Sequence, residues 1–565
     1  MVRNEPSSGQ VFTGTSHDVI VVGAGIGGVY AIHRFRQQGL SVLGLEGGGG
    51  VGGVWYHNHY PGARVDVESP DYCYFFSPEL YREWKWSERY ASQPELLAYI
   101  NFVADKFGIK PHILFNTWMT GAQWRDGTWL VRTSDGRNFT GRFLVMATGN
   151  LSAARKPDFK GLDRFRGDWV QTSHWPDRQV KTAGQRIGVI GTGSSGVQTI
   201  PVLAREANHL YVFQRTPNYS VPANNGPIDR ELYEATCADV TGTWEKLISN
   251  RMGAHMQLGT RPAADYSEEE RLRELERKWA ISGHGMNAVF SDQGTNQAAN
   301  DIVAEFVRGK IRQIVKDPVL AQKLCPEYPI GTRRLCVDIG YYATYNRDNV
   351  TLIDAREEAI EEITETGLRT TKNHYELDVI VFALGFHAFT GQIDRANIRN
   401  EHGKSPTDHW KRGPRTYLGI MTTGFPNYFM LTGPGSPSVL ANMFVGNEYH
   451  VNWIGELMGY MRTQGYSTVE PTEEAQGEWT EHVAEVSQPL IRLRVDNYMV
   501  HVNKDDQSRV FIPYVGGLGR YVARCREVMA KGYEGFRFDQ SVIKRPPTAI
   551  RRNDVVEVLQ DGLSR

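Results

Sequence analysis

One glycine pattern occurs twice in this chain, each time between an apolar run and a stretch with helical character. Residues 18–46 read DVIVVGAGIGGVYAIHRFRQQGLSVLGLE, and residues 186–216 read RIGVIGTGSSGVQTIPVLAREANHLYVFQRT. The glycines of the pattern are Gly23, Gly25 and Gly28 in the first copy and Gly191, Gly193 and Gly196 in the second. A strand, G-x-G-x-x-G and a helix in this order are typical of a dinucleotide-binding unit. We therefore predict an α/β fold with two Rossmann-like domains that each bind a dinucleotide.

The three glycines of such a turn have separate roles. The first permits a tight turn, the second lets the backbone approach the pyrophosphate, and the third lets the helix pack on the strand. The phosphate then lies at the helix N-terminus, where backbone N–H groups are free. In the second copy we count the residues between the glycines as further candidates for cofactor binding, namely Thr192, Ser194 and Ser195.

The two copies differ where the second strand ends. Glu46 follows Gly23 at the same spacing at which Gln214 follows Gly191, and Gln214 is followed by Arg215 and Thr216. A carboxylate accepts hydrogen bonds from a ribose 2′-hydroxyl but repels a 2′-phosphate, which a guanidinium binds. We expect FAD in the first unit and NADPH in the second, although a solvated arginine at a strand end is the alternative interpretation of Arg215.

Length and composition exclude several other function classes. At 565 residues and a net charge of -1, the chain is expected to form two or three packed units with no electrostatic attraction for nucleic acid or anionic membranes. The N-terminus is polar and no apolar run reaches membrane-spanning length, so we expect a soluble cytoplasmic protein with small-molecule partners and no obligate protein partner. The five cysteines are never spaced as C-x-x-C, which argues against a disulfide framework and a metal site.

Two further stretches predict amphipathic helices. SQPELLAYINFVADKFG offers Ser92 and Glu95 as a capping box, and SEEERLRELERKW offers Ser267 and Glu270 as another. Residues 113–146 alternate as short strands. The region between the second nucleotide-binding unit and residue 320 is helical and charged, which predicts a helical insertion in the second nucleotide-binding domain.

Four more motifs carry a resemblance to a known family. Residues 52–66 read GGVWYHNHYPGARVD, and residues 165–176 read FRGDWVQTSHWP. GTRRL at 331–335 and GPGSPS at 433–438 complete the set. With both glycine patterns, the chain resembles the type I Baeyer-Villiger monooxygenases, with an overall pattern like that of the phenylacetone monooxygenase group, from about residue 15 to residue 540.

The resemblance implies an activity that FAD, NADPH and O2 perform together. NADPH reduces FAD, oxygen adds to give a C4a-peroxyflavin, and one oxygen atom is inserted next to a ketone carbonyl to give an ester or a lactone. Two alternatives keep the same cofactors: oxygenation of nitrogen or sulfur, and an uncoupled NADPH oxidase. The absent cysteine pair excludes a disulfide reductase.

The family's fold also implies a division into domains. The FAD domain is expected in two parts, residues 1–150 and residues 386–565, the second with a C-terminal lid loop. The linker fingerprint and the first part of the NADP domain cover residues 151–221, and its second part covers residues 321–385. A helical subdomain of residues 222–320 lies between those two parts.

Carried over motif by motif, the resemblance implies roles for further residues. Arg334 is the candidate catalytic arginine, whose fork of donors suits an oxygen anion, and Asp66 is the candidate that holds it. Apart from the resemblance, the alternative interpretations are a turn residue for Asp66 and an exposed surface charge for Arg334. Arg333 is expected beside Arg215 on the 2′-phosphate. Gly53 and Trp55 are cofactor-binding candidates, and the substrate or lid candidates are Ser438, Val439, Leu440, Met443 and Tyr498.

The chain departs from the family pattern in two places. The fingerprint F-x-G-x-x-x-H-T-x-x-W-P has Gln171 at its histidine, and His174 follows beside the tryptophan. Glutamine cannot ionise near neutral pH, so we favour a structural role for Gln171 in the hinge and expect His174 to be a linker residue. The lid sequence is rewritten as NYMVHVNKDDQSRVF, with Tyr498 at the family's tryptophan and Asn503 at its asparagine. The substrate ketone therefore cannot be predicted from the family.

Overall fold

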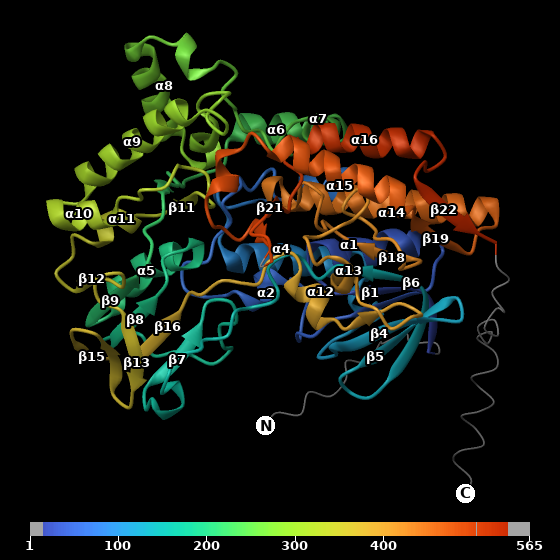
Figure 1. The fold of residues 1–565 in the computed structure, drawn as a ribbon, viewed down its shortest axis with the longest axis horizontal. Helices are drawn as coiled ribbons and strands as arrows, with labels where there is room; N and C mark the ends of the chain where they lie inside the picture. The colour runs from blue at the N-terminus through green and yellow to red at the C-terminus, as the bar shows by residue number, and fades with distance from the viewer. Residues whose placement is uncertain (1–14, 504, 541–565) are drawn as a thin grey trace, which may run out of the picture.

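The structure is a computed structural model that describes residues 15–503 and 505–540. Two sheets lie side by side in Figure 1, each with a helix of a glycine pattern packed against it, and longer helices cover them from above. The polar segment expected at the N-terminus and the last residues of the expected second part of the FAD domain lie outside the described residues.

The first sheet combines strands from both halves of the chain. Its order is β17-β4-β5-β6-β1-β2-β3, with β18 also paired to β6. β1 pairs in parallel with β2 and β6, whereas β4, β5 and β6 are antiparallel. The strands are β1 (Ser16–Val22), β2 (Val42–Leu45), β3 (Ile113–Leu114), β4 (Met119–Arg125), β5 (Thr128–Thr133), β6 (Asn138–Met146), β17 (Ile398–Arg399) and β18 (Tyr428–Met430).

The second sheet is parallel throughout. Its order is β12-β9-β8-β16-β7, and β8 and β16 at its centre are buried along almost their whole length. The strands are β7 (Asp168–Gln171), β8 (Arg186–Ile190), β9 (His209–Gln214), β12 (Val350–Asp354) and β16 (Val379–Phe382). An apolar run without alternation is what a parallel strand covered on both faces requires.

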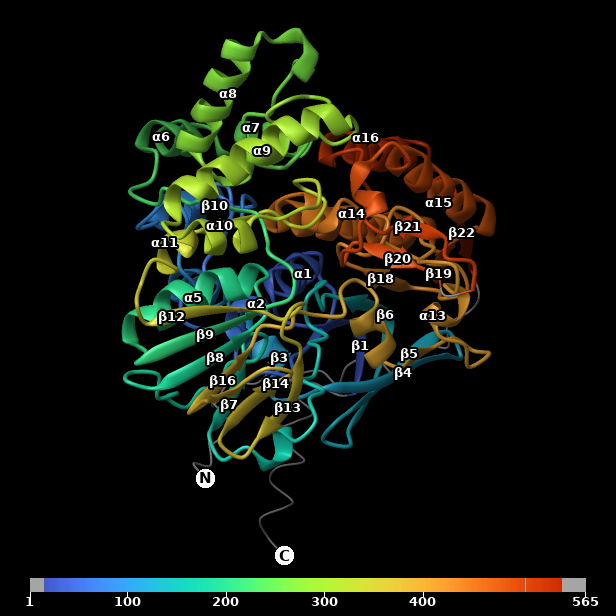
Figure 2. The same ribbon diagram turned by 60° about the vertical axis from the view of Figure 1, so that its left-hand side comes forward.

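A helical segment, α6 to α10, follows β9 and stands above the second sheet in Figure 2. Each of these helices begins at a side chain that accepts a hydrogen bond from a free N–H of the first turn. The helices are α6 (Arg230–Ala238), α7 (Val240–Ser249), α8 (Glu268–Ile281), α9 (Gln297–Ile314) and α10 (Pro318–Leu324), with the short 3-10 helices η3 (Ala263–Asp265) and η4 (Gly283–Ala288).

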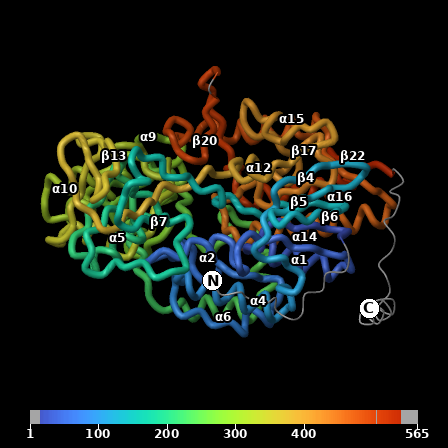
Figure 3. Tube along the Cα trace, turned by 90° about the horizontal axis from the view of Figure 1, so that it is seen from below, coloured from blue at the N-terminus to red at the C-terminus, as the bar shows by residue number. Residues whose placement is uncertain are grey.

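The C-terminal helices cover the first unit. α14 (Met443–Gln464) packs along α1 (Ile26–Gln37), and Figure 3 shows the two side by side. Because α1 lies between the sheet and α14, it is buried around most of its surface. Two more helices, α15 (Glu473–Ser487) and α16 (Leu518–Ala530), complete this layer.

The remaining helices and strands lie beside and between these layers. The helices are α2 (Val54–His57), α3 (Pro78–Glu83), α4 (Gln93–Lys106), α5 (Ser194–Glu206), α11 (Tyr341–Thr344), α12 (Gly391–Arg395) and α13 (Pro406–His409), and the 3-10 helices are η1 (Lys110–His112), η2 (Leu162–Arg164), η5 (Ser438–Leu440) and η6 (Ile491–Arg494). The remaining strands are β10 (Ser220–Pro222), β11 (Cys336–Asp338), β13 (Ile360–Thr364), β14 (Gly367–Thr370), β15 (His374–Glu376), β19 (Thr468–Pro471), β20 (Val500–Val502), β21 (Arg509–Phe511) and β22 (Phe536–Asp539).

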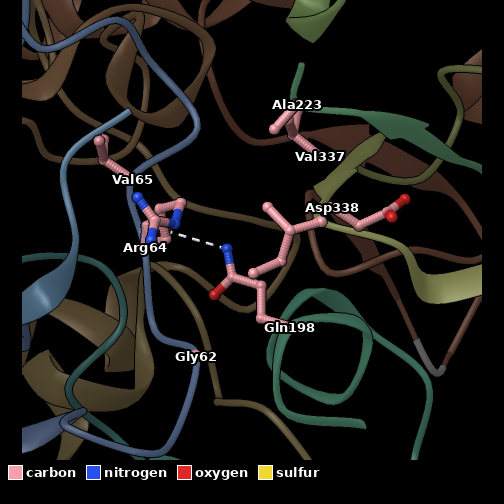
Figure 4. Close-up of a pocket in the computed structure, with 8 residues that line it drawn as sticks. Gly62, Arg64, Val65, Gln198, Ala223, Val337 and Asp338 are labelled. Atoms are coloured by element: carbon pink, nitrogen blue, oxygen red, sulfur yellow. Dashed lines mark hydrogen bonds between the residues drawn. The ribbon is translucent and has the colours of Figure 1, made fainter. Parts of the chain in front are cut away.

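The two nucleotide-binding units touch directly at a small polar junction (Figure 4). Gln198 of α5 donates from Nε2 to the backbone oxygen of Arg64 at 2.9 Å, and Tyr60 donates to Oε1 of Gln198 at 2.7 Å. A Cβ at Gly62 would lie 2.4 Å from the backbone oxygen of Gln198, so only glycine allows this approach. The cavity left beside these residues measures about 10 Å³, which is room for one water molecule and not for a substrate.

Of the two expected capping boxes, one is confirmed and one is wrong. Ser267 and Glu270 form the reciprocal bonds at the start of α8. Ser92 does precede α4, but its side chain makes no capping bond, and the carboxylate of Glu95 accepts the N–H and the hydroxyl of Ser87, both at 2.7 Å, in place of the N–H of Ser92. Within residues 15–503 and 505–540, the helices are too short or too polar to cross a membrane.

Candidate cofactor and active site

The first glycine turn leaves no room for side chains at two of its positions. Gly23 has φ +102°, and a Cβ there would lie 2.6 Å from the backbone oxygen of Ala147. A Cβ at Gly28 would lie 1.8 Å from the oxygen of Gly23. The strand, the turn and α1 therefore pack together only with glycine at both places.

The backbone of Gly25 faces that of Gly53 across the mouth of this turn. A Cβ on Gly53, which has φ +55°, would lie 2.8 Å from Cα of Gly25, and Gly25 is the N-cap of α1. The nearby indole nitrogen of Trp55 is buried without a hydrogen-bond partner among the described residues. Bare backbone at a helix N-terminus, with an unused donor close by in the chain, fits the pyrophosphate of a bound FAD.

Glu46 is buried at the end of β2 with 6% of its surface exposed. Its carboxylate accepts the N–H of Ala24 and the N–H of Gly48, both at 2.7 Å, and Nε2 of His57 lies 3.7 Å away. Burial alone would raise the pKa of Glu46, but His57 and the two N–H donors hold it below its usual value. An ionised carboxylate keeps further lone pairs, which suits a ribose hydroxyl.

The second turn repeats this geometry. Gly191 has φ +110°, with a Cβ at 2.5 Å from the backbone oxygen of Ala383, and a Cβ at Gly196 would lie 2.2 Å from the oxygen of Gly191. Gly193 differs, because no atom lies within 4 Å of where its Cβ would be. The middle glycine therefore borders open space at the N-terminus of α5, where a pyrophosphate would lie.

The polar candidates of the second turn are held by neighbouring elements. The hydroxyl of Thr192 donates to the backbone oxygen of Thr216 at 3.0 Å, so it joins this turn to the loop after β9. The hydroxyl of Ser195 lies 2.8 Å from that of Thr172, and the hydroxyl of Ser194 lies 3.5 Å from Sγ of Cys336.

The two basic candidates for the 2′-phosphate have different surroundings. Arg215 directly follows β9 and its side chain is exposed. The guanidinium of Arg333 lies over the ring of Tyr328 at 5.1 Å, and its Nε is buried and has no hydrogen-bond partner in the described part of the chain.

Asp66 and Arg334 form the charged centre of the site. Nε and Nη2 of Arg334 donate to Oδ2 of Asp66 at 2.9 and 2.6 Å, and Nη2 also donates to Oδ1 at 2.8 Å. Nη1 lies 3.4 Å from the backbone oxygen of Val439. Two parallel donors on one carboxylate fix the plane of the guanidinium.

The charges of this pair are strongly stabilised. Burial alone would raise the pKa of Asp66, but Arg334 and His284 hold it well below its usual range. Burial alone would lower the pKa of Arg334, but Asp66 and the hydroxyl of Tyr498 raise it above its usual value. Arg334 is therefore a permanent cation in the interior of the protein.

Apolar side chains surround the other candidates for substrate or lid contacts. Phe389, Met499, Phe511 and Ile512 form a buried cluster against which Val439, Leu440 and Tyr498 pack. The rings of Tyr498 and Phe389 stack with centroids 6.3 Å apart. Ser438 directly precedes Val439 in η5 and accepts a hydrogen bond from Nδ2 of Asn150 at 2.8 Å, and Met443 begins α14.

Gln171 lies at the end of β7 and has a bonded side chain. Its Nε2 donates to the backbone oxygen of Arg155 at 2.9 Å. His174 follows on the same turn, and its ring stacks on that of His57 with centroids 5.8 Å apart. Both contacts join the linker to neighbouring chain segments.

Sequence reasoning missed one residue of this site. His284, in η4 of the helical segment, has Nε2 at 3.2 Å from Oδ2 of Asp66. The surrounding sequence, ISGHGMN, contains no motif that marks this histidine.

Known proteins resemble this chain over nearly its whole length. Residues 20–226 match a family described as pyridine nucleotide-disulphide oxidoreductase, although this segment contains the single cysteine Cys73 and cannot form a disulfide within itself. A Baeyer-Villiger monooxygenase from Pseudooceanicola batsensis is 38% identical over 94% of this chain and 98% of its own.

Solved structures agree with this match. A structure described as oxidized steroid monooxygenase bound to NADP is 46% identical, has a TM-score of 0.89, and covers 93% of this chain and 100% of its own. A complex of OTEMO with FAD and NADP is 39% identical, has a TM-score of 0.89, and covers 93% of this chain and 99% of its own. At this identity over the full length, the chain belongs to the type I Baeyer-Villiger monooxygenases of the class B flavin monooxygenases.

Proposed function

We propose that this enzyme uses NADPH and O2 to insert one oxygen atom next to the carbonyl of a ketone. Ketone, O2, NADPH and a proton give an ester or lactone, NADP⁺ and water. The observation that carries the proposal is the Asp66–Arg334 pair, which joins the loop after α2 to the segment before β11. FAD, when bound, supplies the electron transfer from NADPH and the activation of O2.

Each glycine turn has the residues to hold its own cofactor. Gly23, Gly25 and Gly28 with Gly53 and Trp55 would hold the pyrophosphate of FAD, and Glu46 would accept its ribose hydroxyls. The second turn would hold NADPH with Thr192, Ser194, Ser195 and its three glycines, while Arg215, Thr216 and Arg333 would bind the 2′-phosphate. The geometry of the two turns supports both assignments.

Arg334 would stabilise negative charge on oxygen as the ketone carbonyl is attacked. Its fixed cation is held in plane by Asp66, so no reorganisation is needed when that charge develops. Nη1 makes no hydrogen bond to Asp66 and lies 3.4 Å from the backbone oxygen of Val439, so it is the donor nitrogen that would turn toward the substrate.

The substrate would be a ketone with apolar groups beside its carbonyl. Val439, Leu440, Tyr498 and Phe389 supply apolar surface near the guanidinium, and such surface excludes water from the reacting atoms. Ser438 at the start of η5 and Met443 at the start of α14 would border this region.

The division into domains is also part of the proposal. FAD would be held by residues 1–150 and 386–565, which supply all strands of the first sheet. NADPH would be held by residues 151–221 and by a second part ending at 385, which supply the second sheet. Because α10 ends at Leu324, we place the end of the helical subdomain there and not at 320.

The test uses ¹⁸O2 with the FAD-loaded enzyme, NADPH and a panel of apolar ketones. One ¹⁸O atom in an ester or lactone, with one NADPH consumed per product, is the expected result. Hydrogen peroxide from every ketone would instead identify an NADPH oxidase. Label found only in N- or S-oxides, after amines and sulfides are tested in parallel, would identify the other alternative.

A further inference from the structure

We propose that His284 of the helical segment is a positioning residue that holds Asp66 in its double contact with Arg334. The side chain of His284 is 9% exposed, and its Nε2 lies 3.2 Å from Oδ2 of Asp66. The inference rests on the proposed ketone oxygenation, in which Arg334 acts on the substrate and His284 acts through Asp66.

A tight turn after α8 presents the histidine to Asp66. Ser282 has φ +77° and Gly283 has φ +70°, so two successive residues adopt left-handed backbone conformations. Such a conformation is strained at Ser282 and persists only where surrounding contacts hold it. A Cβ at Gly283 would lie 2.4 Å from the hydroxyl of Tyr90, so the turn lies directly against the first unit.

One tautomer of the imidazole suits both of its neighbours. When Nδ1 is the acceptor, Nδ2 of Asn287 can donate to it across 3.3 Å. In a neutral imidazole Nε2 then carries the hydrogen. Nε2 has no well-aligned hydrogen bond within residues 15–503 and 505–540, which leaves the carboxylate of Asp66 as the acceptor within reach.

The imidazole limits how Asp66 can move. Arg334 donates to both oxygens of the carboxylate, and Nε2 of His284 lies 3.2 Å from Oδ2 on another side. The same two residues lower the pKa of Asp66 against the effect of burial. A carboxylate contacted from two separate chain segments has one favoured orientation, and that orientation sets the plane of Arg334.

A second histidine provides a matched control. His255, which lies between α7 and α8, contacts Asp71 of the first unit with Nδ1 to Oδ1 at 2.5 Å. It is another histidine–aspartate pair that joins the helical segment to the first unit, but its aspartate is not the partner of Arg334. A purely structural contribution would therefore be similar for His284 and His255.

The experiment compares His284→Leu, His284→Gln and His255→Leu in the FAD-loaded enzyme. His284→Leu is expected to lower kcat for ester formation about tenfold, the equivalent of one hydrogen bond to a charged group, with the KM for NADPH unchanged. His284→Gln should restore most of this loss, because its amide can still donate to Asp66. His255→Leu should lower the unfolding temperature without changing ester formed per NADPH consumed. Equal kinetic losses in His284→Leu and His255→Leu, or no rescue by glutamine, would overturn the inference.

A readout independent of turnover is a double-mutant cycle on thermal unfolding. His284→Leu, Asp66→Asn and the double variant are compared with the wild type, and the shift of the double variant should be smaller than the sum of the single shifts. Additive shifts would show that the two side chains do not interact and would overturn the inference. If the wild type makes no ester, the proposed function fails, and this cycle still decides whether His284 holds Asp66.

Discussion

Arg334 and Asp66 are 268 residues apart in the sequence and share three hydrogen bonds of 2.6 to 2.9 Å. Asp66 lies in the loop after α2 of the first unit, and Arg334 lies just before β11. The contact therefore exists only when the two nucleotide-binding units are in place against each other. The proposed role of Arg334 in catalysis depends on that arrangement.

Replacing Arg334 tests its proposed role directly. Arg334→Ala should lower ester formation on the order of 100-fold or more while FAD stays bound, because one donor to a developing oxygen anion contributes that much. Arg334→Lys keeps the positive charge but lacks the planar fork of donors, so its rate of ester formation should lie between those of the wild type and Arg334→Ala. Flavin absorbance of the purified variants gives FAD content, and product analysis gives the rate. Ester formation near the wild-type rate in Arg334→Ala would contradict the assignment.

Arg215→Ala should discriminate between the two nicotinamide coenzymes. Its exposed side chain follows β9, where a 2′-phosphate would lie, so its loss should raise the KM for NADPH about 10- to 100-fold and barely change that for NADH. Arg205→Ala, an exposed arginine on α5, is the control and should leave both constants unchanged. Equal losses for NADPH and NADH would show that Arg215 does not contact the 2′-phosphate.

Gly193 and Gly191 should respond differently to alanine. A methyl group at Gly193 meets no protein atom within 4 Å, so Gly193→Ala should unfold at the wild-type temperature but bind NADP⁺ at least about tenfold more weakly. Gly191 has φ +110°, and a Cβ there would lie 2.5 Å from the backbone oxygen of Ala383. Gly191→Ala should therefore also lower the unfolding temperature. Coenzyme titration and thermal unfolding of both variants separate the two effects. Unchanged NADP⁺ binding in Gly193→Ala would place the pyrophosphate elsewhere.

The local parts of the fold could be predicted from the sequence, and the distant contacts could not. The glycine turns follow from steric limits within a few residues, so their strands and helices match the pattern. Capping depends on which groups compete for a side chain. The carboxylate of Glu270 accepts the N–H of Ser267, whereas the carboxylate of Glu95 accepts hydrogen bonds from Ser87 and not from Ser92. His284 reaches Asp66 through tertiary packing alone, and no local sequence signal specifies such a contact.

Gln171→His should leave the coupling of NADPH consumption to ester formation unchanged. The side chain of Gln171 donates to the backbone oxygen of Arg155, which a histidine can also do, so the position needs a donor and not a titrating group. Gln171→Leu removes the donor and should destabilise the fold by about 1 kcal/mol. The measurements are peroxide released per NADPH and the unfolding temperature. A marked gain in coupling with histidine would mean that the natural glutamine limits the enzyme.

Glu448 predicts a pH dependence of stability that its neutral variant lacks. The residue is buried in α14, where it accepts the N–H of Phe75 at 2.9 Å. In the part of the chain that the structure describes, no cation forms an ion pair with it, and burial raises its pKa to about 8. The folded state therefore holds a proton that the unfolded state releases above about pH 4.5.

The sign of the effect follows from this proton. The contribution of the protonated Glu448 to the free energy of unfolding is fully present below about pH 4.5. It is lost as the pH rises to about 8, by an amount on the order of a few kcal/mol. In Glu448→Gln this loss should be absent, so the difference in unfolding temperature between variant and wild type should grow with pH and level off above about pH 8. Glu456→Gln, an exposed glutamate on the same helix, is the control and should give a small difference at every pH. Parallel curves for Glu448→Gln and the wild type would show that Glu448 does not hold its proton in the folded state.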